Sequence, residues 1–439
     1  MTSTNSTVAV VGCGYLGAVL SAVLAEQGNQ VIGLDVDQAK VSQLNSGIAP
    51  FFEPEFQDVL QGALASGKLN FTVDPKEVSA AQIIFICVGT PQQAGNSAAD
   101  LSQIWSAVDA IAPHLAESAI VVGRSTVPVG TAAKIEQRIN QKTGRNYQVA
   151  WNPEFLREGL AISDTRCPDR IVIGTTSAEV ERELRKLYQP QLDKQIPILI
   201  MDVPTAELVK VSANAFLATK ISFINAVSEI AELAGADIVA LAEAIGLDPR
   251  IGNKFLAAGV GFGGGCLPKD IRAFISSGEE LGAAESVKFL TEVDQINTRQ
   301  RTRVVTLAQK LLTDLNGKKV VVLGAAFKPN SDDVRDSPAL DVAHSLHLLG
   351  AQVFVHDPKA IESARARFPE LSYQSDLAAI FQDCDLVLHL TEWSIYRELD
   401  PVAIGSIVRN PVLIDGRNVL DFGKWRAAGW QVSGLGKKA

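Results

Sequence analysis

Near its N-terminus the chain reads Thr7-Val-Ala-Val-Val-Gly-Cys-Gly-Tyr-Leu-Gly17, followed further on by Gln30-Val-Ile-Gly-Leu-Asp35. The apolar run of the first stretch predicts a buried strand, and the glycine-rich turn after it opens a helix. The second stretch predicts another strand, which ends at an acidic residue. Three glycines at this spacing, between a strand and a helix and with an aspartate at the end of the next strand, are typical of a dinucleotide-binding βαβ unit.

Each glycine of this fingerprint has its own physical task. Gly12 permits the tight turn, Gly14 lets the backbone approach a pyrophosphate, and Gly17 allows the helix to pack closely on the strand. The helix N-terminus adds partial positive charge for the pyrophosphate. Asp35 would accept hydrogen bonds from both ribose hydroxyls and would repel a 2′-phosphate, so we expect NAD rather than NADP.

Composition and charge exclude several classes of protein. The 439 residues correspond to about three domains at roughly 150 residues each, and 47% hydrophobic with 20% charged residues is typical of a globular chain. The net charge of −9 gives no basic footprint, so we expect neither nucleic acid nor a membrane surface as a partner. The five cysteines are widely spaced and contain no C-x-x-C pair, which favours a reduced, cytoplasmic location without a disulfide framework.

Strand and helix patterns divide the chain. Short β-branched runs alternate with helical stretches at both ends, whereas from about Pro204 to Leu312 only helical periodicity is seen. Lys319-Val-Val-Val-Leu-Gly324 repeats the first strand and glycine, so the last region resembles a second nucleotide-binding half. We therefore expect an α/β fold: two Rossmann-like, doubly wound parallel-sheet domains joined by a central all-helical domain. The predicted domains are an NAD-binding domain at 1–203, the helical domain at 204–315 and the second Rossmann-like domain at 316–439.

One cysteine lies in a glycine-rich loop, in the stretch Gly261-Phe-Gly-Gly-Gly-Cys266-Leu-Pro-Lys-Asp270. Pro268 is typical of a first helical position, which places Cys266 near a helix N-terminus. This position, with a lysine nearby, can lower the pKa of a thiol below its usual value of about 8.5. We interpret Cys266 as a nucleophile. The other four are interpreted as small buried hydrophobic residues: Cys13, Cys87, Cys167 and Cys384.

A nucleophilic thiol beside a nicotinamide implies a particular reaction. A dehydrogenase that makes an aldehyde can trap it as a thiohemiacetal, oxidise this to a thioester and hydrolyse the thioester to an acid. An alcohol would then be converted to a carboxylate on one enzyme, with two molecules of NAD consumed.

These features resemble the nucleotide-sugar dehydrogenases, the UDP-glucose/GDP-mannose dehydrogenase family, over nearly the whole chain. The motifs that carry the resemblance, besides the glycine fingerprint and the Cys266 loop, are Val88-Gly-Thr-Pro91, Ser125-Thr-Val-Pro-Val-Gly130, Asn152-Pro-Glu-Phe-Leu-Arg-Glu-Gly159, Lys210-Val-Ser-Ala-Asn214, Phe327-Lys-Pro-Asn330 and Asp415-Gly-Arg417. The resemblance implies NAD-dependent, four-electron oxidation of UDP-glucose to UDP-glucuronate through a Cys266 thiohemiacetal and thioester. It also implies that the last domain binds the UDP sugar.

The resemblance further implies the catalytic residues. Cys266 is the nucleophile, and Lys210 and Asn214, on one face of a helix, stabilise oxyanions at the reacting carbon. The family's other catalytic residues orient water and take up protons, and how they divide these two tasks is left open. In this chain they correspond to Glu154, Thr126 and Asp270.

Binding residues follow from the same resemblance. It implies cofactor contacts at Gly12, Gly14, Tyr15, Leu16, Gly17, Asp35, Lys40, Thr90, Thr126, Glu158 and Arg335. It implies substrate contacts at Glu154, Phe155, Leu156, Arg157, Glu158, Lys210, Asn214, Arg250, Phe262, Gly263, Lys328 and Arg417. Two of these, Lys328 and Arg417, are suitable cations for a diphosphate.

In the family, the arginine that corresponds to Arg250 reaches the substrate site of a partner subunit, which implies a homodimer. The stretch from Gln92 to Asp100 departs from the family's usual acidic-glycine loop, which leaves the cofactor contacts there open. The five histidines form no ligand set, and we expect no metal.

Three alternatives stay open at this point. A sister enzyme acting on GDP-mannose or UDP-N-acetylmannosamine would use the same thiol chemistry. A single-step hydroxyacid dehydrogenase would stop after one hydride transfer and would need no nucleophilic cysteine. A nucleotide-sensing protein would bind without reaction.

Overall fold

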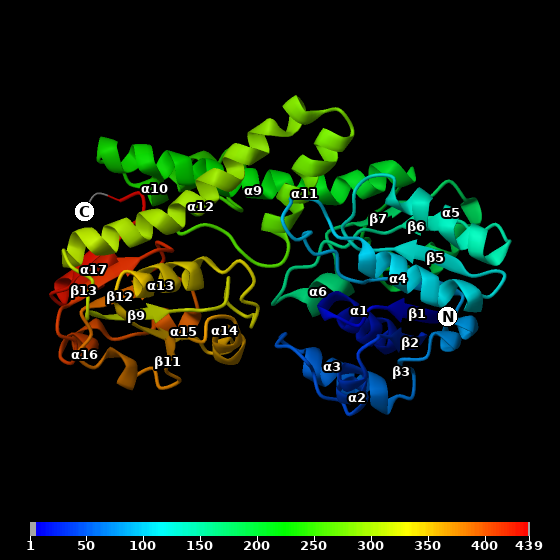
Figure 1. Cartoon of the computed structure of the whole chain (residues 1–439), viewed down its shortest axis with the longest axis horizontal. Coiled ribbons are helices and arrows are strands. Elements are labelled where there is room, and N and C mark those ends of the chain that lie inside the picture. Colours follow the sequence, from blue (N-terminus) through cyan, green and yellow to red (C-terminus); the bar gives the residue numbers. More distant parts are fainter. Residues whose placement is uncertain (1–5, 438–439) are drawn as a thin grey trace. The chain divides into compact units, whose positions relative to one another are not determined.

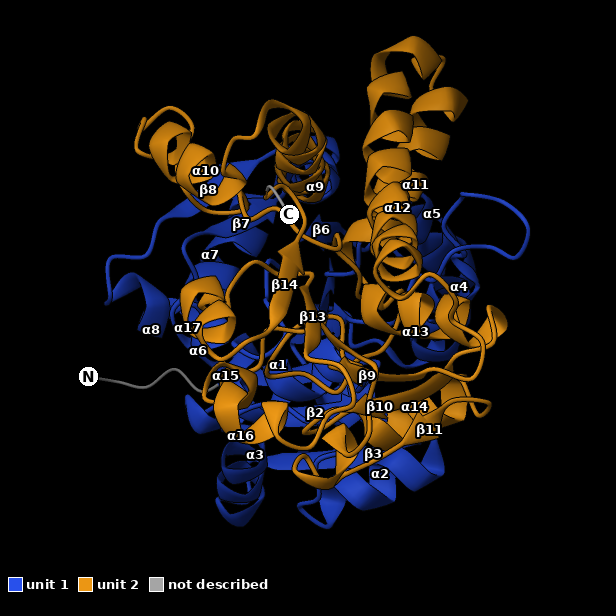
Figure 2. Ribbon diagram, turned by 90° about the vertical axis from the view of Figure 1, so that its left-hand side faces the viewer, with its two compact units in different colours: residues 1–213 blue, residues 214–439 orange. Residues whose placement is uncertain are grey.

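The structure, a computed structural model, describes residues 6–437. The chain forms two compact units, residues 1–213 and 214–439, coloured separately in Figure 2. Each unit contains its own largely parallel sheet covered by helices (Figure 1). In the described part of the chain, no helix is long and apolar enough to cross a membrane. The predicted three-domain division at residues 203 and 315 stays a prediction.

The first unit contains an eight-stranded sheet in the order β3-β2-β1-β4-β5-β6-β7-β8. The strands are β1 Thr7–Val11, β2 Gln30–Leu34, β3 Leu69–Thr72, β4 Ile83–Ile86, β5 Ile120–Gly123, β6 Val149–Trp151, β7 Ile171–Gly174 and β8 Ile198–Met201. Strands β1 to β6 are parallel, as predicted. The pair β6–β7 is antiparallel and meets only at Trp151 and Gly174, so β7 and β8 run against the rest of the sheet.

Helices cover both faces of this sheet. They are α1 Tyr15–Glu26, α2 Gln38–Asn45, α3 Phe56–Ala65, η1 Pro75–Ala80, α4 Ser102–Ile111, η2 Ala112–His114, α5 Thr131–Thr143, α6 Ala161–Arg166, α7 Ala178–Leu187 and α8 Gln189–Leu192. Val8 and Val10 enter one hydrophobic core, whereas Ala9 and Val11 enter another. Because both faces are buried, these strands are continuously apolar rather than alternating.

The helical middle of the chain is confirmed. It contains α9 Val203–Ala234, α10 Ile238–Gly246, α11 Leu267–Glu280 and α12 Ala284–Leu312. Within residues 203–312, all of which are described, no strand occurs. Helix α9 begins in the first unit and continues in the second.

The second unit carries a six-stranded, all-parallel sheet in the order β11-β10-β9-β12-β13-β14. Its strands are β9 Lys319–Leu323, β10 Gln352–His356, β11 Ser372–Tyr373, β12 Leu386–His389, β13 Val412–Asp415 and β14 Gln431–Gly434. Its helices are α13 Pro338–Leu348, α14 Ile361–Arg367, η3 Ala379–Phe381, α15 Ser394–Arg397, α16 Pro401–Gly405 and α17 Phe422–Ala427. This order matches that of the first six strands of the other sheet, which confirms the predicted repeat.

All five cysteines lie in the described part of the chain and are free thiols. Burial raises the pKa of Cys87 and of Cys384 to about 12, as suits inert core residues. The prediction that Cys167 is buried is wrong, because this residue directly follows the end of α6 and is exposed. Its sulfur lies 3.2 Å from the Lys194 Nζ.

Candidate active site

The glycine turn has the shape that a dinucleotide requires. Gly12 has φ 92°, and a Cβ there would lie 2.8 Å from the Val88 side chain. A Cβ at Gly17 would lie 1.8 Å from the Gly12 carbonyl oxygen. By contrast, nothing lies within 4 Å of a Cβ built on Gly14, which is the N-cap of α1. The backbone is therefore open at the position where a pyrophosphate would approach the helix N-terminus.

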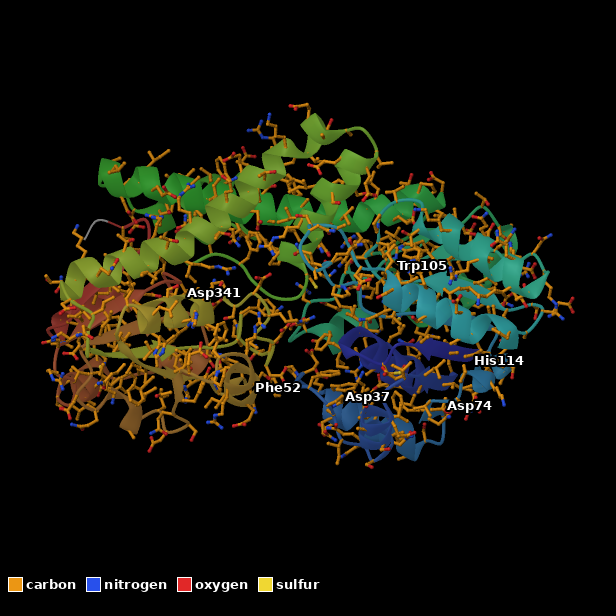
Figure 3. The ribbon with its side chains drawn as sticks, in the orientation of Figure 1. Asp37, Phe52, Asp74, Trp105, His114 and Asp341 are labelled. Atoms are coloured by element: carbon orange, nitrogen blue, oxygen red, sulfur yellow. The ribbon has the colours of Figure 1, made fainter. Side chains whose placement is uncertain are left out.

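Asp35 directly follows the last residue of β2 and lies beside this turn. Its carboxylate accepts the backbone N–H of Cys13 at 2.8 Å and lies 3.1 Å from the Lys40 Nζ. Lys40 lies in the first turn of α2. Asp37, labelled in Figure 3, is the N-cap of this helix, and its side chain accepts hydrogen bonds from the N–H groups of Ala39 and Lys40. Asp35 and Lys40, predicted separately, are thus adjacent, and the predicted contact of Asp35 with ribose hydroxyls stays a prediction.

The two threonines of the cofactor set also meet. Thr90 follows β4 and Thr126 follows β5, and these neighbouring parallel strands end at the same edge of the sheet. The Thr90 hydroxyl donates to the Thr126 carbonyl oxygen at 2.8 Å, and the Ser125 hydroxyl donates to the Val88 carbonyl oxygen at 2.6 Å. The carboxyl ends of parallel strands are where α/β sheets bind ligands.

Glu154 and Lys210 form a buried ion pair. The Lys210 Nζ lies 2.9 Å from Glu154 Oε1, and the side chains are only 5% and 4% exposed. Burial alone would raise the pKa of Glu154, but the charge and hydrogen bond of Lys210, helped by the Leu156 N–H, outweigh burial and lower this pKa. Glu154 therefore keeps its charge at neutral pH, and a lysine at this position can stabilise a developing oxyanion.

A second buried cluster, which sequence reasoning missed, holds the start of the 152–159 segment. Asn152 Oδ1 accepts from Arg124 Nη1 and from the Tyr188 hydroxyl, each at 2.5 Å, while Asn152 Nδ2 donates to the Val172 carbonyl oxygen at 2.7 Å. Arg124 also lowers the pKa of Glu154. Asn152 opens a motif of the chain, but only the fold brings Arg124 and Tyr188 to it.

The rest of this segment is fixed by its own neighbours. Phe155 lies under Arg170, whose Cζ is 3.7 Å from the ring centroid. Arg157 donates twice to Asp164, with the shorter contact at 2.5 Å. Leu156 is half-buried, and its N–H donates a hydrogen bond to the Glu154 carboxylate. The predicted substrate segment is thus a structured loop of the first unit.

In the second unit, Cys266 is the N-cap residue of α11, as predicted, with Pro268 in the first turn. The α11 residue Asp270 is buried and accepts from Asn214 Nδ2 at 2.6 Å and from the Lys269 Nζ at 2.6 Å. The N–H of Asp270 donates to the Cys266 carbonyl oxygen at 3.0 Å. Cys266, Asn214 and Asp270 are thus linked within this unit.

The glycines before Cys266 are needed because other segments lie against them. A Cβ on Gly263 would be 2.2 Å from the Asp336 carbonyl oxygen, and one on Gly265 would be 2.2 Å from the Arg335 guanidinium carbon. Arg335, predicted from the cofactor set, therefore lies beside the nucleophile's loop. The N–H and carbonyl of Phe262 are both hydrogen-bonded to the buried side chain of Asn297, at 2.8 and 3.0 Å. Asn297 was missed, because nothing in its helical sequence pattern marks it.

Arg417 binds three carbonyl oxygens of different segments: Leu390 at 2.7 Å, Gly261 at 2.9 Å and Phe327 at 3.3 Å. Its guanidinium also lies 3.2 Å from the Glu392 carboxylate. Lys328 lies near this group, with its Nζ 5.3 Å from the Phe327 ring centroid. Arg417 thus holds the beginning of the Cys266 loop, whatever else it binds.

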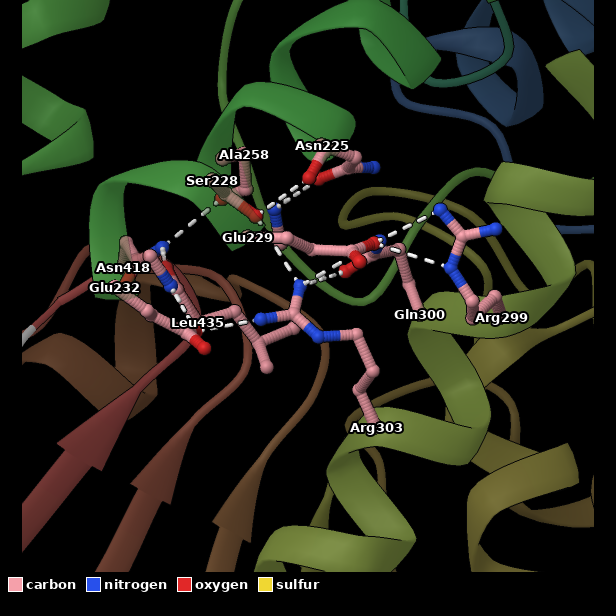
Figure 4. Close-up of polar contacts among 12 residues, drawn as sticks. Asn225, Ser228, Glu229, Glu232, Ala258, Arg299, Gln300, Arg303, Asn418 and Leu435 are labelled. Atoms are coloured by element: carbon pink, nitrogen blue, oxygen red, sulfur yellow. Dashed lines mark hydrogen bonds and ion pairs between the residues drawn. The ribbon is translucent and has the colours of Figure 1, made fainter. Parts of the chain in front are cut away.

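A polar network, drawn in Figure 4, fixes the chain that leads into this loop. Asn225 Oδ1 accepts the Gly259 N–H at 2.8 Å, and Asn418 Nδ2 donates to the Ala258 carbonyl oxygen at 3.1 Å. Ion pairs connect α9 to α12, namely Glu229 with Arg299 at 3.1 Å and Glu232 with Arg303 at 2.6 Å.

Two further predictions concern residues away from these clusters. Arg250 is 88% exposed and pairs with Asp248 at 2.6 Å within its own turn. Among the described residues, no group of three His, Cys, Asp or Glu side chains could hold a metal ion.

Comparison with known proteins gives three successive family matches. They are the UDP-glucose/GDP-mannose dehydrogenase family NAD binding domain over residues 6–192, its central domain over 204–299 and its UDP binding domain over 321–422. UDP-glucose 6-dehydrogenase TuaD of Bacillus subtilis is 40% identical over 98% of this chain and 93% of its own length.

Solved structures agree. A UDP-glucose dehydrogenase from Pyrobaculum islandicum superposes with a TM-score of 0.91 at 39% identity, covering 99% of both chains. A UDP-D-ManNAc dehydrogenase from Pyrococcus horikoshii superposes with a TM-score of 0.86 at 26% identity, covering 98% of this chain and 99% of its own. The glycine turn, the Cys266 loop and these matches lead to one conclusion: the chain belongs to the UDP-glucose/GDP-mannose dehydrogenase family.

Proposed function

We propose that this protein oxidises UDP-glucose to UDP-glucuronate and reduces two molecules of NAD. The observation that carries the proposal is the Cys266 thiol at the N-cap of α11, in a chain whose first unit has the glycine turn and Asp35 of an NAD site. Relatives of 37–40% identity are named UDP-glucose 6-dehydrogenase, which favours UDP-glucose over the sister substrates.

NAD would supply a hydride acceptor: one molecule would take the hydride from the sugar's C6 alcohol and leave as NADH, and a second molecule would take the later hydride. Cys266 attacks the aldehyde carbon left by the first transfer, so that a C–S bond forms and the carbonyl π electrons move to oxygen. Loss of the second hydride from this thiohemiacetal gives the thioester. Water then adds to the thioester carbon, the C–S bond breaks, and the acid leaves with the thiolate regenerated.

Lys210 and Asn214 are assigned to the oxygen that carries negative charge at each tetrahedral stage. They lie one helical turn apart on α9 and both can donate. Glu154 and Asp270 form ion pairs with Lys210 and Lys269, and a carboxylate at either position can accept a proton or orient water. Thr126 joins them by its position beside Thr90. Gly263, Phe262, Lys328 and Arg417 are assigned to the nucleotide sugar, and Glu158 and Arg335 to the cofactor side.

A stoichiometric assay tests this function. With NAD in excess and each sugar limiting, we expect two NADH per UDP-glucose and none above background with GDP-mannose or UDP-N-acetylmannosamine. Two NADH from another sugar would transfer the proposal to that sugar. One NADH per UDP-glucose would identify a single-step dehydrogenase, and NAD binding without NADH from any sugar would identify a sensor.

We also propose that the protein is a homodimer joined along α9, with Arg250 reaching the partner's substrate. Phe216, Phe223 and Ile230 recur every seven residues of α9 and are 67%, 55% and 65% exposed, which forms an apolar stripe that water disfavours.

Replacement of Phe223 by aspartate is expected to convert the dimer to a monomer in analytical ultracentrifugation and to lower activity at least about tenfold, because a buried charge at the interface is unpaired. Val402→Asp, at an exposed site of α16, is the control and should stay dimeric and active. A wild-type protein that sediments as a monomer with full activity would contradict this proposal.

The cytoplasmic location is part of the same proposal. None of the five cysteines, each within the described range, forms a disulfide, and Cys167 is exposed. Unpaired exposed thiols persist in reducing compartments.

A further inference from the structure

Glu53 is a buried carboxylate in the loop between α2 and α3, and it lies outside every site predicted from the sequence. It is 5% exposed. Its Oε1 accepts the Ala161 N–H at 2.7 Å, and its Oε2 accepts the Gly159 N–H at 2.6 Å together with the hydroxyl of Tyr15. Both carboxylate oxygens are therefore engaged by donors from other segments.

These donors come from two segments that serve different ligands. Tyr15 is the first residue of α1 and directly follows Gly14, the open glycine of the NAD turn. Gly159 ends the 152–159 segment, which begins at the buried Asn152 and carries Glu154. The Gly159 N–H also lies 3.2 Å from the Tyr15 oxygen, so the two segments touch each other as well as Glu53.

The geometry ties the positions of these segments together. Gly159 has φ 79°, a left-handed conformation that glycine adopts without strain. Burial, the hydrogen bond to Glu53 and the charges of Glu53 and Glu158 all raise the pKa of Tyr15, so its hydroxyl keeps its proton and acts as the donor. The Tyr15 ring is packed 4.8 Å from the Phe51 ring, which limits its other rotamers.

Hydrogen bonds to a buried carboxylate are short and strong, and displacement of one donor is costly. A shift of the NAD turn at Tyr15 would therefore be resisted by the same carboxylate that orients Gly159 and Ala161.

We propose that Glu53 is a positioning residue that couples the NAD-binding turn to the sugar-binding segment 152–159 through Tyr15 and Gly159. The part that concerns UDP-glucose rests on the proposed function. Glu53 touches neither ligand in this scheme; it sets the mutual position of the two segments that do.

Binding measurements on the full-length protein test this coupling without turnover. Calorimetry gives the Kd of UDP-glucose in the absence of NAD, and the Kd of NAD in the absence of sugar, for wild type, Glu53→Gln, Tyr15→Phe and the double variant. Glu53→Gln should raise the Kd of each ligand about tenfold, since an amide cannot accept hydrogen bonds from all three donors. Tyr15→Phe, a change in the NAD turn, should weaken UDP-glucose binding as well. The double variant should bind UDP-glucose no more weakly than Glu53→Gln alone, because both changes remove the same contact.

A matched control separates coupling from general loss of stability. Asp385 is a fully buried carboxylate of the second unit that accepts the Lys319 N–H and pairs with Arg409, at the amino end of β12. Asp385→Asn should lower the melting temperature and leave both Kd values unchanged. Equal weakening in this control would overturn the coupling.

Two further results would also overturn the proposal. The first is a Tyr15→Phe protein whose UDP-glucose Kd equals that of wild type, and the second is additive effects in the double variant. If wild type itself binds NAD but not UDP-glucose, the proposed substrate fails and this inference fails with it. If wild type binds both ligands and the variants bind them equally well, this inference fails and the proposed function stands.

Discussion

Replacement of Cys266 by serine is expected to abolish UDP-glucuronate formation, with kcat for the overall oxidation lowered by about 1,000-fold or more. A serine hydroxyl at the N-cap of α11 stays protonated at neutral pH, because an alcohol is a far weaker acid than a thiol, and it is therefore a much weaker nucleophile. The variant can transfer at most the first hydride. The expected yield is therefore no more than one NADH per UDP-glucose in a limiting-sugar assay, with no acid detected by chromatography.

The same substitution at another thiol provides the control for this experiment. Cys167 is exposed and follows the end of α6, so Cys167→Ser should keep wild-type turnover and the full yield of NADH. A Cys266→Ser protein that still produces two NADH per sugar would show that another group forms the covalent intermediate, or that none is formed.

Replacement of Lys210 by methionine is expected to lower both activity and stability strongly. Loss of an oxyanion donor costs about 100- to 1,000-fold in kcat. Loss of the partner also leaves the Glu154 carboxylate buried and unpaired, which costs about 3–5 kcal/mol of unfolding free energy. Urea denaturation and steady-state rates measure the two effects separately.

The Lys210→Met variant should also differ from wild type in the direction in which its stability changes with pH. In wild type the pKa of Glu154 is lowered by Lys210, so the ion pair stabilises the fold at neutral pH, and its contribution is lost only as the pH falls below the usual glutamate range, through the lowered pKa. Without Lys210, burial raises that pKa instead, and the folded state then binds the proton more tightly than the unfolded chain does. The Lys210→Met protein should therefore become more stable as the pH is lowered from neutrality.

The double variant Glu154→Gln/Lys210→Met separates structure from catalysis. With neither charge present, the free energy of unfolding should return to within about 1–2 kcal/mol of wild type, because a buried pair is often replaceable by neutral groups. Activity should remain lost. A double variant that recovers turnover would show that Lys210 serves only to neutralise Glu154.

Much of the fold could be predicted from local pattern. The strands β1, β2, β4, β9, β10 and β12 are largely apolar runs rich in Val, Ile and Leu and mostly buried, which is a signal that survives without tertiary information. Strands β3, β8 and β11 lie at sheet edges, where one side lacks a partner. The short strands β3 and β11 contain polar residues, and the apolar β8 is only partly buried. The reversed direction of β7 and β8 depends on how the chain returns after α6, which no local pattern records.

The site divides in the same way. The sequence by itself determined the residues whose chemistry is local: the glycines of the turn, the aspartate that ends the next strand, and a cysteine followed by a helix-starting proline. Their neighbours along the chain create the backbone conformation and the helix N-terminus on which they depend. Only the tertiary structure decided which distant side chains hold these groups in place, namely Glu53 between Tyr15 and Gly159, Arg124 on Asn152, and Asn297 on Phe262. A buried polar group is satisfied by whichever donor the fold brings within about 3 Å, and sequence separation carries no information about that distance.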